Sequence, residues 1–283
     1  MVMGKALALK RCLAFMLVVG ILLAGISPLR LFCGEETTPD YRLNQEFLSG
    51  FGNDVYEVFK APGRWGSEDW WRLTAVLGTG VLLYAFDQKI HDWSQDHFTQ
   101  KSEDWARVGS TFGNGLFLGG LIASLYLGGE IFDEKSLRKT ALLGLESWLT
   151  AGAVVLGLKA VLGRSRPYTG LGARHFEPFS LRSANYSFPS GHAVSAFAVA
   201  TVVADQTDFI LADVLAYALS TWTALSRVHE SEHWASDVFI GAAIGYFIGK
   251  KICSLHRPEN QTDIQVGFSL RPGAKGLTIT LSF

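Results

Sequence analysis

The chain has 283 residues, of which 48% are hydrophobic and 18% are charged, and its formal net charge is −1. This length suits one large domain or two small ones. The near-zero charge gives no support for nucleic-acid binding, and the apolar fraction exceeds that of an average soluble protein. The three cysteines, Cys12, Cys33 and Cys253, exclude a disulfide framework. Free thiols are expected, and a single bridge between Cys33 and Cys253 is the alternative.

The N-terminus has the pattern of a targeting or anchoring segment. Basic residues, the last of them Lys10 and Arg11, precede an apolar run over 12–26. Such a pattern indicates a secretory signal or a membrane anchor. We therefore expect residues 1–33 to be a signal peptide or an N-terminal membrane anchor, with cleavage left open. Residues 34–71 form a polar, amphipathic lead-in.

Six apolar segments follow, and none contains an internal proline, which favours helices: 73–86, 116–131, 141–162, 193–204, 209–225 and 238–252. The sequence thus predicts an all-α domain over 72–252, a six-helix bundle embedded in a membrane. The tryptophans at 65, 70 and 71 favour the membrane. Several segments are shorter than the ~20 residues that span a bilayer, so a soluble helical core is the alternative.

Glycines recur along the last apolar segment, and the C-terminal tail changes character. Gly241, Gly245 and Gly249 fall on one helical face, which predicts close approach of a neighbouring helix. Within the tail, 253–283, two stretches alternate apolar and polar residues around a Pro-Gly turn, which predicts a short β-hairpin. Two strands cannot close a barrel of about eight, so we expect the hairpin to pack on the helical body or on a partner.

The first cluster of charged residues ends the third apolar segment and reads K-A-V-L-G-R-S-R-P. Lys159 and Arg166 are two helical turns apart and can share one face. Pro167 marks the helix exit. Two cations beside apolar sequence need an anion or carboxylates, although snorkelling toward lipid headgroups is an ordinary alternative.

The second cluster, P-S-G-H, opens the next helix. Ser190 stands at the expected N-cap, and Gly191 leaves its backbone N–H uncovered. A helix N-terminus is a ready anion site, and His192 in the first turn would reach a bound anion. By itself the pattern also fits an ordinary capped helix with an exposed histidine.

The third cluster reads S-R-V-H-E-S-E-H-W-A-S-D. His233 and Asp237 are four positions apart, as neighbours on one helical face. An aspartate that holds one ring nitrogen of a histidine fixes its tautomer and leaves the other nitrogen free to react. Arg227 adds a planar fork suited to phosphate oxygens.

The same stretch also fits the zinc-protease pattern H-E-x-x-H, with His229, Glu230 and His233. The pattern has few fixed positions, and a catalytic zinc needs a third protein ligand. Glu259 is the downstream candidate, but it lies among polar tail residues after Pro258. We therefore expect no metal at this site.

Together the clusters, K-x6-R-P, P-S-G-H and S-R-x5-H-x3-D, resemble the type 2 phosphatidic acid phosphatase and vanadium haloperoxidase superfamily. All fixed positions match in order and spacing: Lys159, Arg166, Pro167, Pro189, Ser190, Gly191, His192, Ser226, Arg227, His233 and Asp237. The motifs cover 159–237, and the helical pattern extends the resemblance over about 73–252.

The resemblance implies a role for each site residue. Five residues would hold the phosphate oxygens: Lys159, Arg166, Ser190, Gly191 and Arg227. His233 would attack phosphorus and form a phosphohistidine, Asp237 would orient His233, and His192 would protonate the leaving alcohol and later activate water. Three side-chain cations and helix N–H groups can supply the charge that phosphoryl transfer needs, so neither a cofactor nor a metal is expected.

Within the resemblance, the phosphatase branch is expected: hydrolysis of a phosphomonoester or pyrophosphate, with a lipid phosphate as the first hypothesis. The alternatives are a periplasmic acid phosphatase or phosphotransferase on soluble substrates and a vanadate-dependent haloperoxidase. The sequence does not identify the leaving group or the oligomeric state. The loop 168–188 is expected to line the entrance, and four of its side chains are candidates for headgroup contacts: Arg174, His175, Arg182 and Tyr186.

We expect a bacterial inner-membrane protein whose site faces the periplasm, with a soluble periplasmic protein as the alternative. Arg138 and Lys139 before one apolar segment, and Lys250 and Lys251 at the end of the last, indicate cytoplasmic ends. If the N-terminal segment and all six later segments cross, however, the motifs fall in the cytoplasm. The conflict disappears if 73–86 does not cross fully or if the whole body is periplasmic.

Overall fold

The computed structural model of the chain describes residues 41–207, 209–257, 263–271 and 274–282. The expected signal or anchor, with Cys12 and Cys33, lies outside the described residues. The chain divides into two compact units. One is Tyr41–Leu255, and the other includes the described residues from His256 onward.

The described residues contain eight α-helices: α2 (Gln45–Lys60), α3 (Ser67–Asp96), α4 (Gln100–Thr111), α5 (Gly115–Ile131), α6 (Lys135–Leu162), α7 (Gly191–Gln206), α8 (Ile210–His229) and α9 (Ala235–Leu255). Three short 3-10 helices join them: η1 (Ala61–Arg64), η2 (Pro167–Thr169) and η3 (Ser183–Asn185). Each of the six predicted apolar segments falls in one helix, with Phe209 as the N-cap of α8. The predicted count of six is too low, because α2 and α4 are helices as well.

Local caps explain why the two unpredicted helices form in polar sequence. Asn44 caps α2 by accepting a bond from the Phe47 N–H at 2.8 Å. Thr99 caps α4 by accepting from the Ser102 N–H at 3.1 Å, and the Ser102 hydroxyl closes a reciprocal capping box. On α4 a tryptophan at 105 packs on that at 222 of α8, with ring centroids 5.3 Å apart. A cap and one apolar stripe are enough for a short helix.

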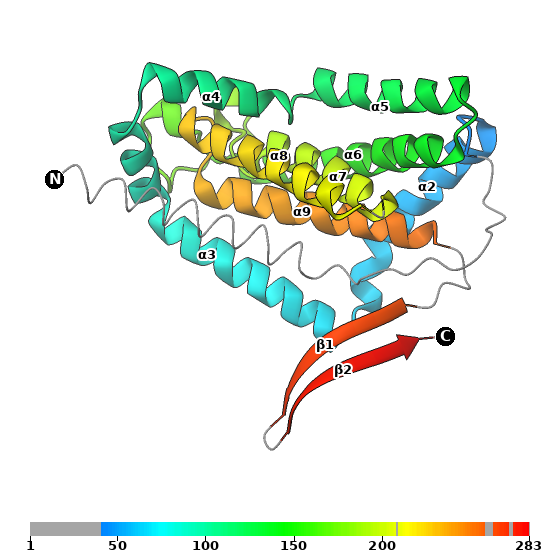
Figure 1. Cartoon of the computed structure of the whole chain (residues 1–283). Coiled ribbons are helices and arrows are strands. Elements are labelled where there is room, and N and C mark those ends of the chain that lie inside the picture. The colour runs from blue at the N-terminus through cyan, green and yellow to red at the C-terminus, as the bar shows by residue number, and fades with distance from the viewer. Residues whose placement is uncertain (1–40, 208, 258–262, 272–273, 283) are drawn as a thin grey trace. The chain divides into compact units, whose positions relative to one another are not determined.

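Helix α7 is the central element of the helical unit and packs against α6, α8 and α9. Helices α4 and α5 follow one another along one side, bent by 45°, with α4 on α8 and α5 on α6 (Figure 1). Helix α3 packs mainly against α9. Helix α7 therefore has three of the other helices as direct neighbours.

The glycines of α9 allow close contact with α7, as predicted. A Cβ atom at Gly245 would lie 2.3 Å from the Val194 carbonyl oxygen, and one at Gly241 would lie 2.8 Å from that of Ser190. Such distances leave no room for a side chain. The contact brings the starts of α7 and α9 together, where the Ser190 N–H donates to the Asp237 carbonyl at 3.0 Å.

Within the described residues two helices, α6 and α9, are long and apolar enough to cross a membrane, or three spans if the bent pair α4 and α5 counts as one. The expectation of six membrane helices is too high by this measure. Large apolar side chains nevertheless lie exposed on the surface of the bundle, among them Val81, Leu82, Leu116, Leu127, Ile131, Leu156, Ile210 and Val214. A bilayer accommodates such a surface. The apolar helices and this surface together indicate a membrane protein.

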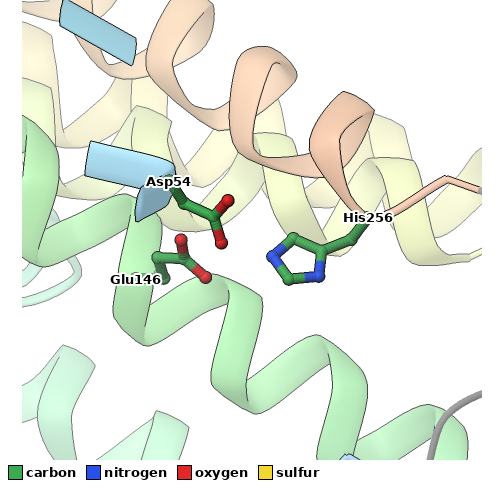
Figure 2. Close-up of side chains that lie close together, drawn as sticks. All are labelled: Asp54, Glu146 and His256. Carbon is green, nitrogen blue, oxygen red and sulfur yellow. The ribbon is translucent and has the colours of Figure 1, made fainter. Parts of the chain in front are cut away.

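Helix α2 carries an acidic side chain toward α6. Figure 2 shows the carboxylates of Asp54 and Glu146 close together, with their oxygen atoms within 4.8 Å of one another. Glu146 is buried. The close-up also draws His256, the residue after the end of α9. The described part of the predicted lead-in, which contains α2, therefore belongs to the helical unit.

The second unit contains two strands, β1 (Asp263–Arg271) and β2 (Ala274–Ser282). They pair antiparallel, with Asp263 opposite Ser282 and Arg271 opposite Ala274. Whether this hairpin packs on the helical body or on a partner stays a prediction.

Candidate active site

The helical unit gathers the residues of the three clusters at one end, where α6 and α8 end and α7 and α9 begin. They come from the following places: Lys159 from the last turn of α6, Arg166 from the segment after it, Ser190, Gly191 and His192 from the start of α7, Arg227 from the last turn of α8, His233 from the α8–α9 connection and Asp237 from the first turn of α9. Gly163 allows α6 to stop, because its φ of 59° is left-handed and a Cβ there would meet the Glu177 carbonyl.

Three cations influence the protonation of the two histidines. Lys159, Arg166 and Arg227 each lower the pKa of His192 and of His233. The backbone N–H of His233 also donates to the Arg227 carbonyl at 3.2 Å. The structure thus brings together residues that lie up to 78 positions apart in the chain (159 to 237).

His233 is 2% exposed. Burial, followed by the three neighbouring cations, holds its pKa well below the usual value, so the ring is neutral. Its Nδ1 lies 2.6 Å from the Ser187 carbonyl oxygen. Because a carbonyl only accepts, Nδ1 carries the proton and Nε2 keeps the lone pair. The described residues provide no hydrogen-bond partner for Nε2, which is the nitrogen available for attack.

Asp237 lies at the site but does not bond His233 directly, contrary to the predicted pairing. Its Oδ2 accepts from the Ser187 hydroxyl at 2.5 Å and from the Trp234 N–H at 3.0 Å. Its Oδ1 accepts from Arg164 Nη1 at 2.5 Å. Both carboxylate oxygens are therefore committed elsewhere, and Ser187 stands between Asp237 and His233.

A second buried carboxylate supports this arrangement from α3. Arg164 is 1% exposed and bonds Asp237 through Nη1 and Asp87 Oδ2 through Nη2 at 2.8 Å. The Ser236 hydroxyl donates to the same oxygen of Asp87 at 2.5 Å. The Arg164 carbonyl accepts the Ser187 N–H at 2.9 Å. Arg164, Asp87 and Ser187 were not predicted, although a charge at the end of an apolar run is a signal for Asp87.

Several donors near the cations lack a partner among the described residues. They are Arg166 Nε, Arg227 Nε and the hydroxyl of Ser190, all buried. A buried donor without a partner costs about 1–3 kcal/mol. An anion placed between these groups would satisfy them. The donor set therefore fits phosphate.

The start of α7 adds backbone donors. Ser190 stands at the N-cap position, but its side chain makes no cap bond, so its hydroxyl is available to a ligand. A Cβ at Gly191 would meet only the Lys159 Cε, at 4.0 Å. The start of α7 is therefore open at Gly191, close to Lys159, and the helix dipole favours an anion there.

His192 is partly buried, in the first turn of α7. Burial, then Arg227, Arg166 and Lys159, lower its pKa from 6.5 to about 4. His192 is therefore neutral at physiological pH. A bound dianion would offset the field of the cations and raise this pKa.

The zinc motif does not have the geometry it requires. Helix α8 ends at His229, and Ser231 has a φ of 57°, so residues 229–233 do not form the helix that would align both histidines. His229 instead contacts the hydroxyls of Ser94 and Ser102, at 3.2 and 2.9 Å.

The predicted entrance loop reaches the site through a backbone group. The Tyr186 carbonyl accepts a bond from Lys159 Nζ. His175 contacts the Ser165 hydroxyl at 2.8 Å, whereas Arg174 and Arg182 are exposed. A headgroup role for the four side chains of this loop stays a prediction.

The segment that contains this site is similar to known proteins. A family model described as the PAP2 superfamily matches residues 140–260. A lipid A 1-phosphatase of Porphyromonas gingivalis is 38% identical over 68 residues, 23% of this chain and 15% of that protein. One of Rhizobium johnstonii is 35% identical over 124 residues, 39% of this chain and 49% of that protein. The chain thus aligns with about half or less of the length of these relatives.

Among solved structures, the first transmembrane PAP2 type phosphatidylglycerolphosphate phosphatase from Bacillus subtilis superposes with a TM-score of 0.49 and 19% identity, over 64% of this chain and 94% of that one. The three motif clusters all fall within the segment that the family model matches. The part of the chain that forms this site therefore belongs to the PAP2 superfamily, the type 2 phosphatidic acid phosphatases.

Proposed function

We propose that the protein is a metal-independent lipid phosphatase that removes phosphate from a phosphomonoester or pyrophosphate through a phosphohistidine. One observation carries the proposal: a buried, neutral His233 with an open Nε2 lies among three cations. Arg166 Nε, Arg227 Nε and the Ser190 hydroxyl have no partner among the described residues and could bind the phosphate. Three cations with helix N–H groups supply the charge that phosphoryl transfer requires.

In the first step His233 Nε2 attacks phosphorus. A P–N bond forms as the P–O bond to the leaving alcohol breaks, and His192 gives the alcohol its proton. In the second step water attacks the phosphohistidine and His192 takes the proton of that water. The new P–O bond forms as the P–N bond breaks, phosphate leaves and His233 returns to its neutral form.

The phosphate-binding group has five members in this proposal: Lys159, Arg166, Ser190, Gly191 and Arg227. His192 needs a proton for the first step, but its pKa of about 4 keeps it neutral at physiological pH. Binding of a phosphate dianion raises that pKa, so the substrate itself prepares the acid. Asp237 acts as a positioning residue through Ser187 and Arg164.

A lipid is the proposed substrate because the site lies at one end of a bundle whose surface exposes large apolar side chains. The matched relatives are named lipid A 1-phosphatases, which supports the same class. We further propose a bacterial inner membrane with the site toward the periplasm. Lys139, Lys250 and Lys251 lie near the ends of α6 and α9 that are opposite the site, as the positive-inside rule expects.

The test is a panel of lipid and soluble phosphates on purified protein with EDTA present, and with His233→Ala as control. We expect turnover of lipid phosphates in EDTA and none in the variant. Preference for soluble phosphomonoesters would favour an acid phosphatase, and halide oxidation with added vanadate would favour a haloperoxidase. Full loss of activity in EDTA would contradict the metal-independent mechanism.

A further inference from the structure

A carboxylate occupies the pair of arginines at the phosphate site. Glu232 Oε2 accepts a bond from Arg166 Nη1 and lies 3.4 Å from Arg227 Nη2. One carboxylate oxygen therefore serves both guanidinium groups. Glu232 directly precedes His233 in the chain, so this contact lies beside the proposed nucleophile.

Glu232 satisfies the two arginines only in part. The Nε of each guanidinium still lacks a partner among the described residues. A phosphate group carries more oxygens than one carboxylate and could serve Nη and Nε together, as bidentate arginine contacts do. Glu232 thus takes the place of an anion between the two arginines, but it leaves part of their hydrogen-bonding capacity unused.

A neighbouring carboxylate provides the contrast. Glu230 Oε2 bonds Arg227 Nη1 at 2.5 Å and also accepts from the Ser110 hydroxyl of α4 at 2.7 Å. Glu230 is therefore anchored to a helix as well as to the arginine. Among the described residues, the side chain of Glu232 pairs with the two arginines alone, and it is 29% exposed. Glu232 has room to leave, whereas Glu230 is held.

We propose that Glu232 is an internal anion that occupies the arginine pair in the empty enzyme and that the phosphate of the substrate displaces it. Glu232 is then a specificity-determining residue. A terminal phosphate dianion carries more charge than the carboxylate and displaces it. A phosphodiester carries a single charge and gains no electrostatic advantage over it. This inference rests on the proposed phosphatase function and adds a filter to the same site.

The experiment compares Glu232→Gln with the matched variant Glu230→Gln. Binding of vanadate is measured by calorimetry on the full chain in detergent, and KM and kcat are measured for a lipid phosphate. We expect Glu232→Gln to bind vanadate about tenfold more tightly, the effect of roughly 1.4 kcal/mol, and to lower KM. A dialkyl phosphodiester should become a better inhibitor. Glu230→Gln should bind vanadate no more tightly than the wild type.

The opposite results separate two failures. Vanadate affinity that is unchanged or weaker in Glu232→Gln, beside a wild type that binds vanadate and turns over, overturns the displacement and leaves the phosphatase standing. Equal tightening in both variants also overturns it, because general charge removal would then explain the effect. A wild type that neither binds vanadate nor releases phosphate overturns the proposed function and this inference together.

Discussion

Two arginines of one motif, separated by a single serine, have opposite surroundings. Arg164 is 1% exposed and lies between two buried aspartates, Asp87 and Asp237. The side chain of Arg166 is 21% exposed, and its ion pair is with Glu232, while its Nε has no partner among the described residues. The first arginine is saturated and the second is only partly occupied.

This contrast distinguishes a charged residue that stabilises the fold from one that binds a ligand. A buried cation needs a complete set of acceptors, because an uncompensated charge in the interior costs several kcal/mol. Arg164 has that set, including the Ala173 carbonyl at 2.7 Å from Nη2. The Nε of Arg166 has no partner among the described residues, so it can bind a further anion. Arg164 should therefore matter mainly for stability, and Arg166 mainly for catalysis.

Replacement of the saturated arginine should have the largest effect on stability. Arg164→Ala would leave Asp87 and Asp237 buried without their counter-ion. We expect a loss of about 3–5 kcal/mol of unfolding free energy, measured by thermal or denaturant unfolding in detergent. A variant with unchanged unfolding would show that Arg164 is not the scaffold residue described here.

Replacement of the partly occupied arginine should instead affect catalysis. Arg166→Ala removes a donor aimed at the phosphate, and we expect kcat/KM to fall on the order of 10²–10³-fold. Unfolding should change far less than in Arg164→Ala. Steady-state kinetics on a lipid phosphate provide the measurement, and equal effects of the two variants on stability would break the comparison.

Replacement of Asp87, which lies behind Arg164, should have an intermediate effect that is confined to turnover. Asp87→Asn weakens the hold on Arg164 and, through Asp237 and Ser187, the placement of His233. We expect kcat to fall about tenfold while the vanadate affinity stays unchanged. Asp205→Asn is the matched control, because Asp205 is a buried aspartate near the opposite end of α7 and pairs with Lys250 at 3.3 Å. An equal fall of kcat in the control would reduce Asp87 to a stabilising role.

The smallest expected effect is on the pH dependence of stability. The pKa of His192 is about 4 in the folded chain against 6.5 for the free side chain. Between these values the unfolded chain holds a proton that the folded chain lacks. The free energy of unfolding should therefore fall as the pH drops from about 6.5 to about 4. His192→Asn should flatten this part of the profile, and an unchanged slope would contradict the assigned shift.

The sequence was sufficient to predict where the site residues lie, because helix ends leave clear marks. Pro167 and the Ser190–Gly191 pair locate two of these ends, and the glycines of α9 predict its contact with α7. The partner of His233 was beyond sequence reasoning. A backbone carbonyl such as that of Ser187 leaves no signal in residue identity, and its position follows from tertiary packing alone.

The errors have physical causes of the same kind. Helices α2 and α4 are stabilised by caps and single apolar stripes, so an apolar segment count misses them. Spacing suggested Asp237 as the direct partner of His233, but Arg164 and Ser187 already occupy its two oxygens. Glu232 stands at a variable position of both sequence patterns and was given no role, whereas in the structure it contacts the two arginines.

The central claim is that His233 carries the phosphoryl group during turnover. His192→Asn with an aryl phosphate tests it most directly, because an aryl leaving group needs no acid while water attack still needs the missing base. Rapid quenching under alkaline conditions, which preserve phosphohistidine, followed by peptide mass spectrometry should show phosphate on His233. Phosphate on another residue, or full turnover without any trapped phosphate, would contradict the account.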